Sequence, residues 1–308
     1  WESREWSGGT VWQVAEEAGL KCLITHYPVG VWPSPLRRGY VVAPGFRDPP
    51  FLLSDAGEYF CSPAPARGEV KEGGMRLRSV DMVEEGGPPG STAVPLVPAQ
   101  GWRNLEEDAW EGMVSIPLRS GGEERLYLLA RPGNEGRLSI YAERDAAHPL
   151  LQANLGEWTQ FAVREFGGEE GSVRFRLLAT SPGPSFHLCR SQIYATRGFT
   201  YPEGLAQELI QAVGPFFVRF SVYPRGQAEL ETFLEDGRYQ GHWEAHVARY
   251  IQEHYGWDLH FCHWHIFDNI NHPTVNLVDP EGPHYDPEVG AWNMEAQRRT
   301  YVIADEVL

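Results

Sequence analysis

Residues 258–272 read DLHFCHWHIFDNINH, and this stretch decides the fold that we expect. Its first ten residues form an apolar run that is typical of a buried strand, and the run stops at Asp268. Asp268 and His272 then place a carboxylate and an imidazole four residues apart. In open α/β sheets, ligands bind beyond the carboxyl ends of the strands. The stretch therefore predicts a strand that leads into a candidate metal site.

Two further histidines stand inside the same run. Zinc binds carboxylate oxygen and imidazole nitrogen, but a zinc site takes three or four protein ligands. His263 and His265 are two residues apart and would share one face of a strand, so they are candidates to complete a mononuclear site with Asp268 and His272. Side chains in the middle of a parallel strand usually face the covering helices, however. The sequence therefore favours the interpretation that both are ordinary strand residues.

A possible pocket is suggested by polar residues at two other places. His284, Tyr285 and Asp286 follow a loop that is rich in proline and glycine. His26 follows a short apolar run at residues 21–25, which predicts a strand, and it could face a ligand at the strand end. Loop residues are polar for many reasons, so simple loop polarity explains His284, Tyr285 and Asp286 equally well. For His26, the sequence favours the interpretation of a satisfied polar loop residue.

The pattern of apolar and polar residues predicts an α/β protein in three parts, 1–97, 98–198 and 199–308. Residues 10–20 have a helical period, and Thr10 is placed to cap that helix. After residue 198, helices alternate with strands, which implies a mostly parallel sheet flanked by helices. The expected helices are 202–213, 241–255 and 290–308, and the expected strands are 215–223 and 258–267.

The middle part has a different sequence pattern. Short β-type runs are separated by turns rich in glycine or proline, which indicates an inserted antiparallel module resembling a β-sandwich. The runs are 125–130, 137–142, 158–166, 172–179 and 185–194. Aromatic residues in this module leave a second function open, a platform for a glycan or a lipid headgroup, although such residues more often form core. They are Trp102, Trp110, Tyr141 and Trp158.

Composition limits the class of protein. A chain of 308 residues with 42% hydrophobic residues can bury a large core. The formal net charge of −16 works against binding to a phosphate backbone, so bulk nucleic-acid binding is not expected. The four cysteines show no CxxC pairing, so neither a disulfide framework nor a zinc knuckle is expected. No apolar run reaches 18 residues, so we expect a soluble chain with no transmembrane segment.

Two segments resemble a known family. Residues 6–46, WSGGTVWQVAEEAGLKCLITHYPVGVWPSPLRRGYVVAPGF, and the strand with Asp268 and His272, followed by Asp279-Pro and Tyr285-Asp, are similar to the type I phosphodiesterase/nucleotide pyrophosphatase branch of the alkaline phosphatase superfamily. The similarity is greatest to its bacterial predicted phosphohydrolases and phosphomutases. It covers roughly 1–80 and 200–308. Members of the branch often carry a β-rich insertion with a step like the Gly-Glu-Trp of residues 156–158.

The resemblance implies a partial alkaline-phosphatase-like core and two divalent metal ions, zinc by expectation, that clamp a small phosphorylated substrate. Asp268 and His272 would be two of the three protein ligands of one metal. The family's Thr or Ser nucleophile and its other ligands have no counterpart in this sequence, so catalytic residues stay unassigned. We therefore expect a central portion of a longer phosphoester hydrolase, inactive by itself. The resemblance also suggests a bacterial cytoplasmic protein, with any export signal upstream of Trp1.

Overall fold

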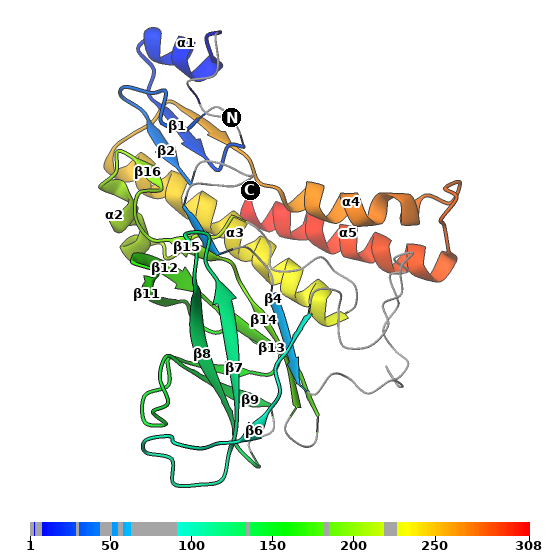
Figure 1. The fold of residues 1–308 in the computed structure, drawn as a ribbon. Coiled ribbons are helices and arrows are strands. Elements are labelled where there is room, and N and C mark those ends of the chain that lie inside the picture. The colour runs from blue at the N-terminus through cyan, green and yellow to red at the C-terminus, as the bar shows by residue number, and fades with distance from the viewer. Residues whose placement is uncertain are drawn as a thin grey trace.

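The computed structural model describes residue 3 and residues 8–28, 31–43, 51–54, 58–62, 91–133, 136–181, 185–218 and 227–308. Helices and strands are mixed over these residues, as expected for an α/β protein (Figure 1). None of the described helices combines the length and the apolar character needed to cross a bilayer.

A small mixed sheet contains the strands that lead to the candidate site. Its strands are β1 (Cys22–Thr25), β2 (Tyr40–Val42), β16 (Thr200–Tyr201) and β17 (Leu259–Cys262), in the order β16-β2-β1-β17. All four residues of β1 are buried, as its apolar run predicts. β1 is parallel to β2 and to β17, and Thr25 is in register with both Val42 and Cys262. The carboxyl ends of three strands therefore meet at one edge.

The helix before β1 confirms one prediction in detail. Helix α1 (Val11–Glu17) begins after Thr10, whose hydroxyl accepts a hydrogen bond from the backbone N–H of Gln13. The Gln13 side chain accepts one in return from the backbone N–H of Thr10 at 2.9 Å. This reciprocal pair is a capping box, and it satisfies two N–H groups that the first turn leaves unpaired.

Three further sheets make up a β-rich part. Their strands are β3 (Leu52–Ser54), β4 (Glu58–Ser62), β5 (Ser91–Ala93), β6 (Val97–Pro98), β7 (Trp110–Pro117), β8 (Glu123–Ala130), β9 (Arg137–Tyr141), β10 (Leu151–Asn154), β11 (Ala162–Phe166), β12 (Glu169–Val173), β13 (Phe175–Ser181), β14 (Ser185–Arg190) and β15 (Ile193–Ala195). The orders are β10-β9-β8-β7-β6, β11-β12-β15-β3 and β13-β14-β4-β5. Ile116, Leu128 and Phe175 are fully buried in their common core.

The sheets differ from the mostly parallel core that the sequence suggested. Among the described strands, parallel pairing is limited to β1 with β2 and β17, and to β4 with β5, and all other ladders are antiparallel. The expectation of a mostly parallel sheet is therefore wrong. Antiparallel strands are present in all five runs predicted within 98–198, but the runs 172–179 and 185–194 each divide between two strands of different sheets. Strands β3 and β4, which precede that range, pair with β15 and β14.

One expected strand, 215–223, is not seen over its described residues, 215–218. Side chains satisfy the backbone there in place of a sheet ladder. The Val218 N–H donates to Oε1 of Gln192, and the Gln240 amide donates to the carbonyls of Phe217 and Val218 at 2.9 and 3.1 Å. Because these groups are already paired, the segment needs no neighbouring strand. Residues 219–223 lie outside the described residues.

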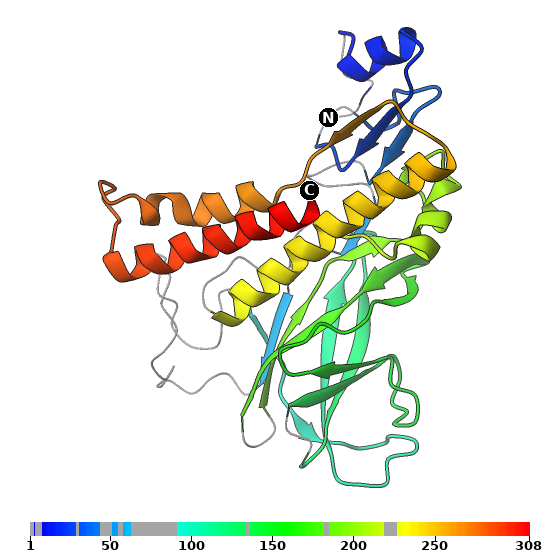
Figure 2. The ribbon, with the colours of Figure 1, turned by 180° about the vertical axis from the view of Figure 1, so that it is seen from behind.

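The four helices of the second half of the chain include one long helix, α3, that contacts the others. They are α2 (Leu205–Ala212), α3 (Gln227–His254), α4 (Ile266–Val278) and α5 (Pro287–Val307). Helix α3 crosses the molecule between the β-rich part and the mixed sheet, and α4 and α5 form a hairpin that projects to one side (Figures 1 and 2). Trp243 of α3 shares a core with Leu23 of β1, and Phe233 shares another with Ile270 of α4.

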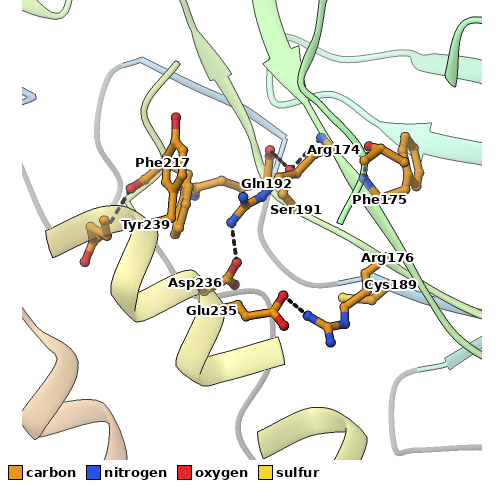
Figure 3. Close-up of polar contacts among 12 residues, drawn as sticks. Arg174, Phe175, Arg176, Cys189, Ser191, Gln192, Phe217, Glu235, Asp236 and Tyr239 are labelled. Carbon is orange, nitrogen blue, oxygen red and sulfur yellow. Dashed lines mark hydrogen bonds and ion pairs between the residues drawn. The ribbon is translucent and has the colours of Figure 1, made fainter. Parts of the chain in front are cut away.

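A buried ion pair between Arg174 and Asp236 connects α3 to the β-rich part. Nη2 of Arg174, between β12 and β13, lies 2.6 Å from Oδ1 of Asp236 on α3, and the side chains are 6% and 0% exposed. Its guanidinium also lies 4.3 Å from the ring centre of Trp158 and 4.7 Å from that of Tyr239. One turn of α3 therefore holds the β-rich part by a charged pair inside an aromatic cage (Figure 3).

Candidate functional site

The stretch that predicted the site folds differently from the expectation. Strand β17 ends at Cys262, and helix α4 begins at Ile266. Asp268 therefore belongs to the first turn of α4. His263 and His265 lie in the short connection at the carboxyl edge of the parallel strands. The interpretation of these histidines as mid-strand residues was wrong, because the strand ends earlier than its apolar pattern indicated.

Asp268 and His272 face one another. Helical spacing of four residues puts them on one face of α4, and Nε2 of His272 lies 3.1 Å from Oδ1 of Asp268. The Asp268 side chain is 49% exposed and the His272 side chain is 76% exposed. Two atoms that bind one zinc ion at about 2.0–2.1 Å stand about 3.3 Å apart in tetrahedral geometry. The observed separation therefore suits shared binding of a metal, and also suits a simple surface ion pair.

His265 contacts the other carboxylate oxygen of Asp268. Its Nε2 lies 3.1 Å from Oδ2 of Asp268, and its Nδ1 lies 3.1 Å from the His263 ring nitrogens. The His265 side chain is only 11% exposed. Each oxygen of Asp268 thus meets a different imidazole, one buried and one exposed.

A buried acid and histidine lie behind this group. His26 follows β1 with φ 48°, a left-handed conformation that is uncommon outside glycine, and it is fully buried. Its Nδ1 lies 3.2 Å from Oε1 of Glu244, on α3. Its ring meets that of His263 edge to face, with centres 6.3 Å apart. Nε2 of His26 is buried without a hydrogen-bond partner among the described residues. His26 therefore lies beneath the edge and does not line an open pocket.

Burial sets the protonation of these groups. Burial lowers the pKa of His263, and the neighbouring His26 lowers it further, whereas Asp268 opposes the shift. Burial, followed by the closeness of His263, lowers the pKa of His265 to about 4. Burial raises the pKa of Glu244, against the effect of its hydrogen bond with His26. At neutral pH, His263 and His265 are neutral imidazoles that can each donate and accept a hydrogen bond.

Glu244 is the residue that the sequence analysis missed. Its signal was present, because Gln240, Glu244 and Ala248 recur at helical spacing on the buried face of α3. A carboxylate on the apolar face of a helix is costly unless it is paired. That pattern could have indicated a buried partner for Glu244, but it could not have identified His26, 218 residues away.

The other predicted pocket residues lie elsewhere. His284, Tyr285 and Asp286 follow the far end of α4, and the ten residue steps from 268 to 278 correspond to about 15 Å of helix. The Asp286 carboxylate caps α5, accepting from the N–H groups of Glu288 and Val289 at 3.0 and 3.2 Å. The structure therefore does not bring these three residues together with Asp268.

The self-contained mononuclear site is not supported by the arrangement of its candidates. Contacts join His263 to His265, His265 to Asp268, and Asp268 to His272, which makes a string. Metal ligands must converge on one point. Over the described part of the chain, no group of three or more His, Cys, Asp or Glu side chains is placed to hold a metal ion.

The aromatic residues of the β-rich part do not form one flat strip. Tyr141 is buried, and Trp102 meets it edge to face at 80° with ring centres 4.9 Å apart. Trp158 covers Arg174 in the cage described above. Stacking on a sugar ring needs an exposed aromatic face. The geometry therefore does not favour the glycan or lipid alternative.

The pair Asp268 and His272 thus lies in the first two turns of α4, just after the connection that leaves the carboxyl edge of the parallel strands. The arrangement of strand, connection and helix is a physical setting for that pair whatever the family. Comparison with known proteins adds nothing to the resemblance: no family model, no curated protein sequence and no solved structure is significantly similar to this chain.

Proposed function

We propose that this chain supplies part of the metal site of a phosphoester hydrolase of the alkaline phosphatase superfamily, with Asp268 and His272 as ligands of one divalent ion. The observation that carries the proposal is the exposed, mutually facing pair in the first two turns of α4, the helix that follows β17. Side chains that pointed apart, or that were buried among apolar neighbours, would have opposed it.

The donor set fits part of a zinc site and not a whole one. Oδ1 of Asp268 and Nε2 of His272 are ligand types that zinc accepts, but three or four protein ligands are usual. The proposal therefore requires at least one further ligand, and the nucleophile stays unassigned. Both side chains are about half exposed or more, so a metal ion and a substrate could reach them.

Because the chain is strongly negative, a bound metal ion would be needed to attract an anionic substrate. A net charge of −16 offers little general attraction for an anionic phosphoester. A divalent ion at Asp268 would provide local positive charge and act as a Lewis acid on a phosphoryl oxygen. The residues of this chain would hold and orient that ion.

Metal titration tests the first half of the proposal. Zinc titrated calorimetrically into the 308-residue chain should bind at one site. Asp268→Asn and His272→Asn should each weaken that binding by about tenfold or more, because each removes one ligand. His284→Asn, an exposed histidine on the other end of the hairpin, is the matched control and should bind as the wild type does. Zinc binding that both site variants leave unchanged would overturn the assignment.

A paramagnetic ion tests the phosphoester half. Manganese bound at Asp268 should broaden the ³¹P signal of phenyl phosphate, and Asp268→Asn should abolish the broadening. Manganese that binds at Asp268 without affecting the phosphorus signal would contradict phosphoester chemistry while leaving the metal site in place.

A further inference from the structure

We propose that Glu244 and His26 form a proton-dependent latch between helix α3 and the carboxyl edge of the mixed sheet. The latch is closed while the pair holds one proton, and it opens as that proton leaves at higher pH. It requires neither a metal ion nor a substrate, so it does not rest on the proposed function. The sequence suggested His26 only as a pocket or loop residue, and it gave no role to Glu244.

The first step is the position of the two side chains. His26 follows the last residue of β1, and its backbone N–H donates to the carbonyl of Val42, the last residue of β2. Nδ1 of His26 and Oε1 of Glu244 are joined by a hydrogen bond of 3.2 Å. The side chains of His26 and Glu244 are 0% and 6% exposed. One buried hydrogen bond therefore connects the ends of two parallel strands to α3.

The second step is the charge balance around the pair. The titratable groups that face it are Cys262 at the end of β17, and His263 and His265 in the connection that follows. Burial raises the pKa of the Cys262 thiol and lowers the pKa of both imidazoles, so all three groups are uncharged at neutral pH. Among the described groups, only His26 lowers the pKa of Glu244. The pair must therefore balance its charge by itself.

The third step is the number of protons. With one proton the pair has no net charge, whether the carboxyl group or the imidazole carries it. When that proton leaves, a carboxylate stays buried beside a neutral imidazole, and a buried charge is costly unless an opposite charge compensates it. Separation of α3 from the edge would let water reach the carboxylate and would remove this cost.

The direction of the pH dependence follows from the pKa of Glu244. Burial raises this pKa, against the effects of the hydrogen bond with His26 and of the charge on His26. The folded protein therefore keeps the proton to a higher pH than the unfolded chain does. The stabilisation is complete below the ordinary value of 4.5, and it is lost as the pH rises through the folded pKa. The latch thus opens on the alkaline side.

The fourth step is the conformation of His26. Its φ is 48°, which is uncommon for a residue other than glycine, and its Nε2 is buried without a hydrogen-bond partner among the described residues. Both features cost stability, and such strain is concentrated at active sites and switches. The hydrogen bond with Glu244 is what His26 supplies and an apolar side chain of similar size cannot. These features favour a contact that can open over one that serves only packing.

Hydrogen exchange of the 308-residue chain between about pH 5 and about pH 9 tests the latch. After correction for the intrinsic pH dependence of exchange, the protection of residues 22–27 and 240–248 should fall as the pH rises, by at most about tenfold per pH unit for one proton. Glu244→Gln keeps a neutral hydrogen-bonding side chain at every pH and should abolish the fall. Glu253→Gln, which alters an exposed acid on the same helix, is the matched control and should behave as the wild type does. An equal fall in Glu244→Gln, or constant protection in the wild type, would overturn the proposal.

Three further measurements separate the latch from a general loss of stability. His26→Asn keeps a residue that tolerates a positive φ, and it should move the fall in protection to higher pH, because His26 lowers the pKa of Glu244. Carbon-13 nuclear magnetic resonance should show the Glu244 carboxyl titrating above 4.5, and a lower value would contradict the latch. Residues 126–129 of β8, in the core of the β-rich part, should keep their protection. A parallel fall there would indicate global unfolding and would overturn the proposal, as would a fall at unchanged pH in His26→Asn.

Discussion

Gly241 is the residue that lets α3 approach the candidate site. A Cβ at this position would lie 2.6 Å from Cζ2 and 2.8 Å from Cη2 of Trp264. Real Cβ atoms do not come so close to another heavy atom, and an indole ring cannot bend aside. Trp264 stands between His263 and His265, so Gly241 sets how closely the helix packs against the connection that carries both imidazoles.

Replacing Gly241 by alanine should therefore destabilise the protein. Alanine is favoured in helices over glycine by about 1 kcal/mol, but the clash with Trp264 should exceed that gain and cost about 1–3 kcal/mol net. The change is measured by urea unfolding. A Cβ on Gly8 would meet nothing within 4 Å, so Gly8→Ala is the matched control and should be near neutral. Gly241→Ala combined with Trp264→Phe should lose less than the sum of the two, since the ring in contact is smaller. Full additivity would contradict the clash.

At the scale of elements, α3 matters because it contacts both halves of the molecule. Asp236, near its start, binds Arg174 of the β-rich part, and Glu244, two turns later, binds His26 beside the candidate site. Glu235 also pairs with Arg176. The contacts with Arg174 and with His26 therefore lie on one helix, about 12 Å apart along its axis.

Removing one member of the Arg174–Asp236 pair should destabilise the protein more than replacing both members by apolar residues. Asp236→Ala leaves the Arg174 cation buried and without that carboxylate, which should lower the free energy of unfolding by about 3–5 kcal/mol. Arg174→Met combined with Asp236→Leu should recover much of the loss, because two apolar side chains of similar volume need no partner. Urea unfolding measures both. Glu295→Gln, which breaks the exposed pair with Arg298, is the control and should leave stability nearly unchanged. A double variant as unstable as Asp236→Ala would argue against a charge effect.

The elements that were predicted well are those that local chemistry decides. Thr10 caps α1 through contacts three residues away, and the apolar run of β1 is buried at every position. The end of β17 was predicted wrongly because the run 258–267 stays apolar across the boundary, and the change from strand to helix depends on packing against α3. Pro273 lies inside α4, where proline normally argues against a helix.

The candidate site was predicted only in part for the same reason. The spacing of Asp268 and His272 is local, so a sequence pattern can detect it. The contact of His26 with Glu244 joins residues that are 218 positions apart. No periodicity connects such residues, and the packing of β1 against α3 brings them together. Sequence reasoning therefore located the edge of the site and not its interior.

At the scale of the whole molecule, buried histidines set the response to acid. Burial lowers the pKa of His187 and His260, as it does for His263 and His265. In the unfolded chain these groups titrate near pH 6.5. The unfolded state therefore binds more protons below that pH, and the free energy of unfolding should fall as the pH drops from about 6.5 towards 4, the pKa of His265. The raised pKa of Glu244 acts in the opposite direction, because the folded state binds that proton more tightly.

His187 gives the clearest test of this pH dependence, because it lies in β14, far along the chain from the candidate metal ligands. Its ring packs on that of Tyr59 with centres 5.4 Å apart, and its Nε2 is buried without a hydrogen-bond partner among the described residues. His187→Phe keeps the ring and removes the titrating group, so the free energy of unfolding should fall less steeply between pH 6.5 and 5 than in the wild type. The slope can change by at most about 1.4 kcal/mol per pH unit for one proton. His284→Asn, which alters an exposed histidine, should keep the wild-type slope. Identical slopes for His187→Phe and the wild type would mean that His187 titrates alike in the folded and unfolded chains, against the effect expected from its burial.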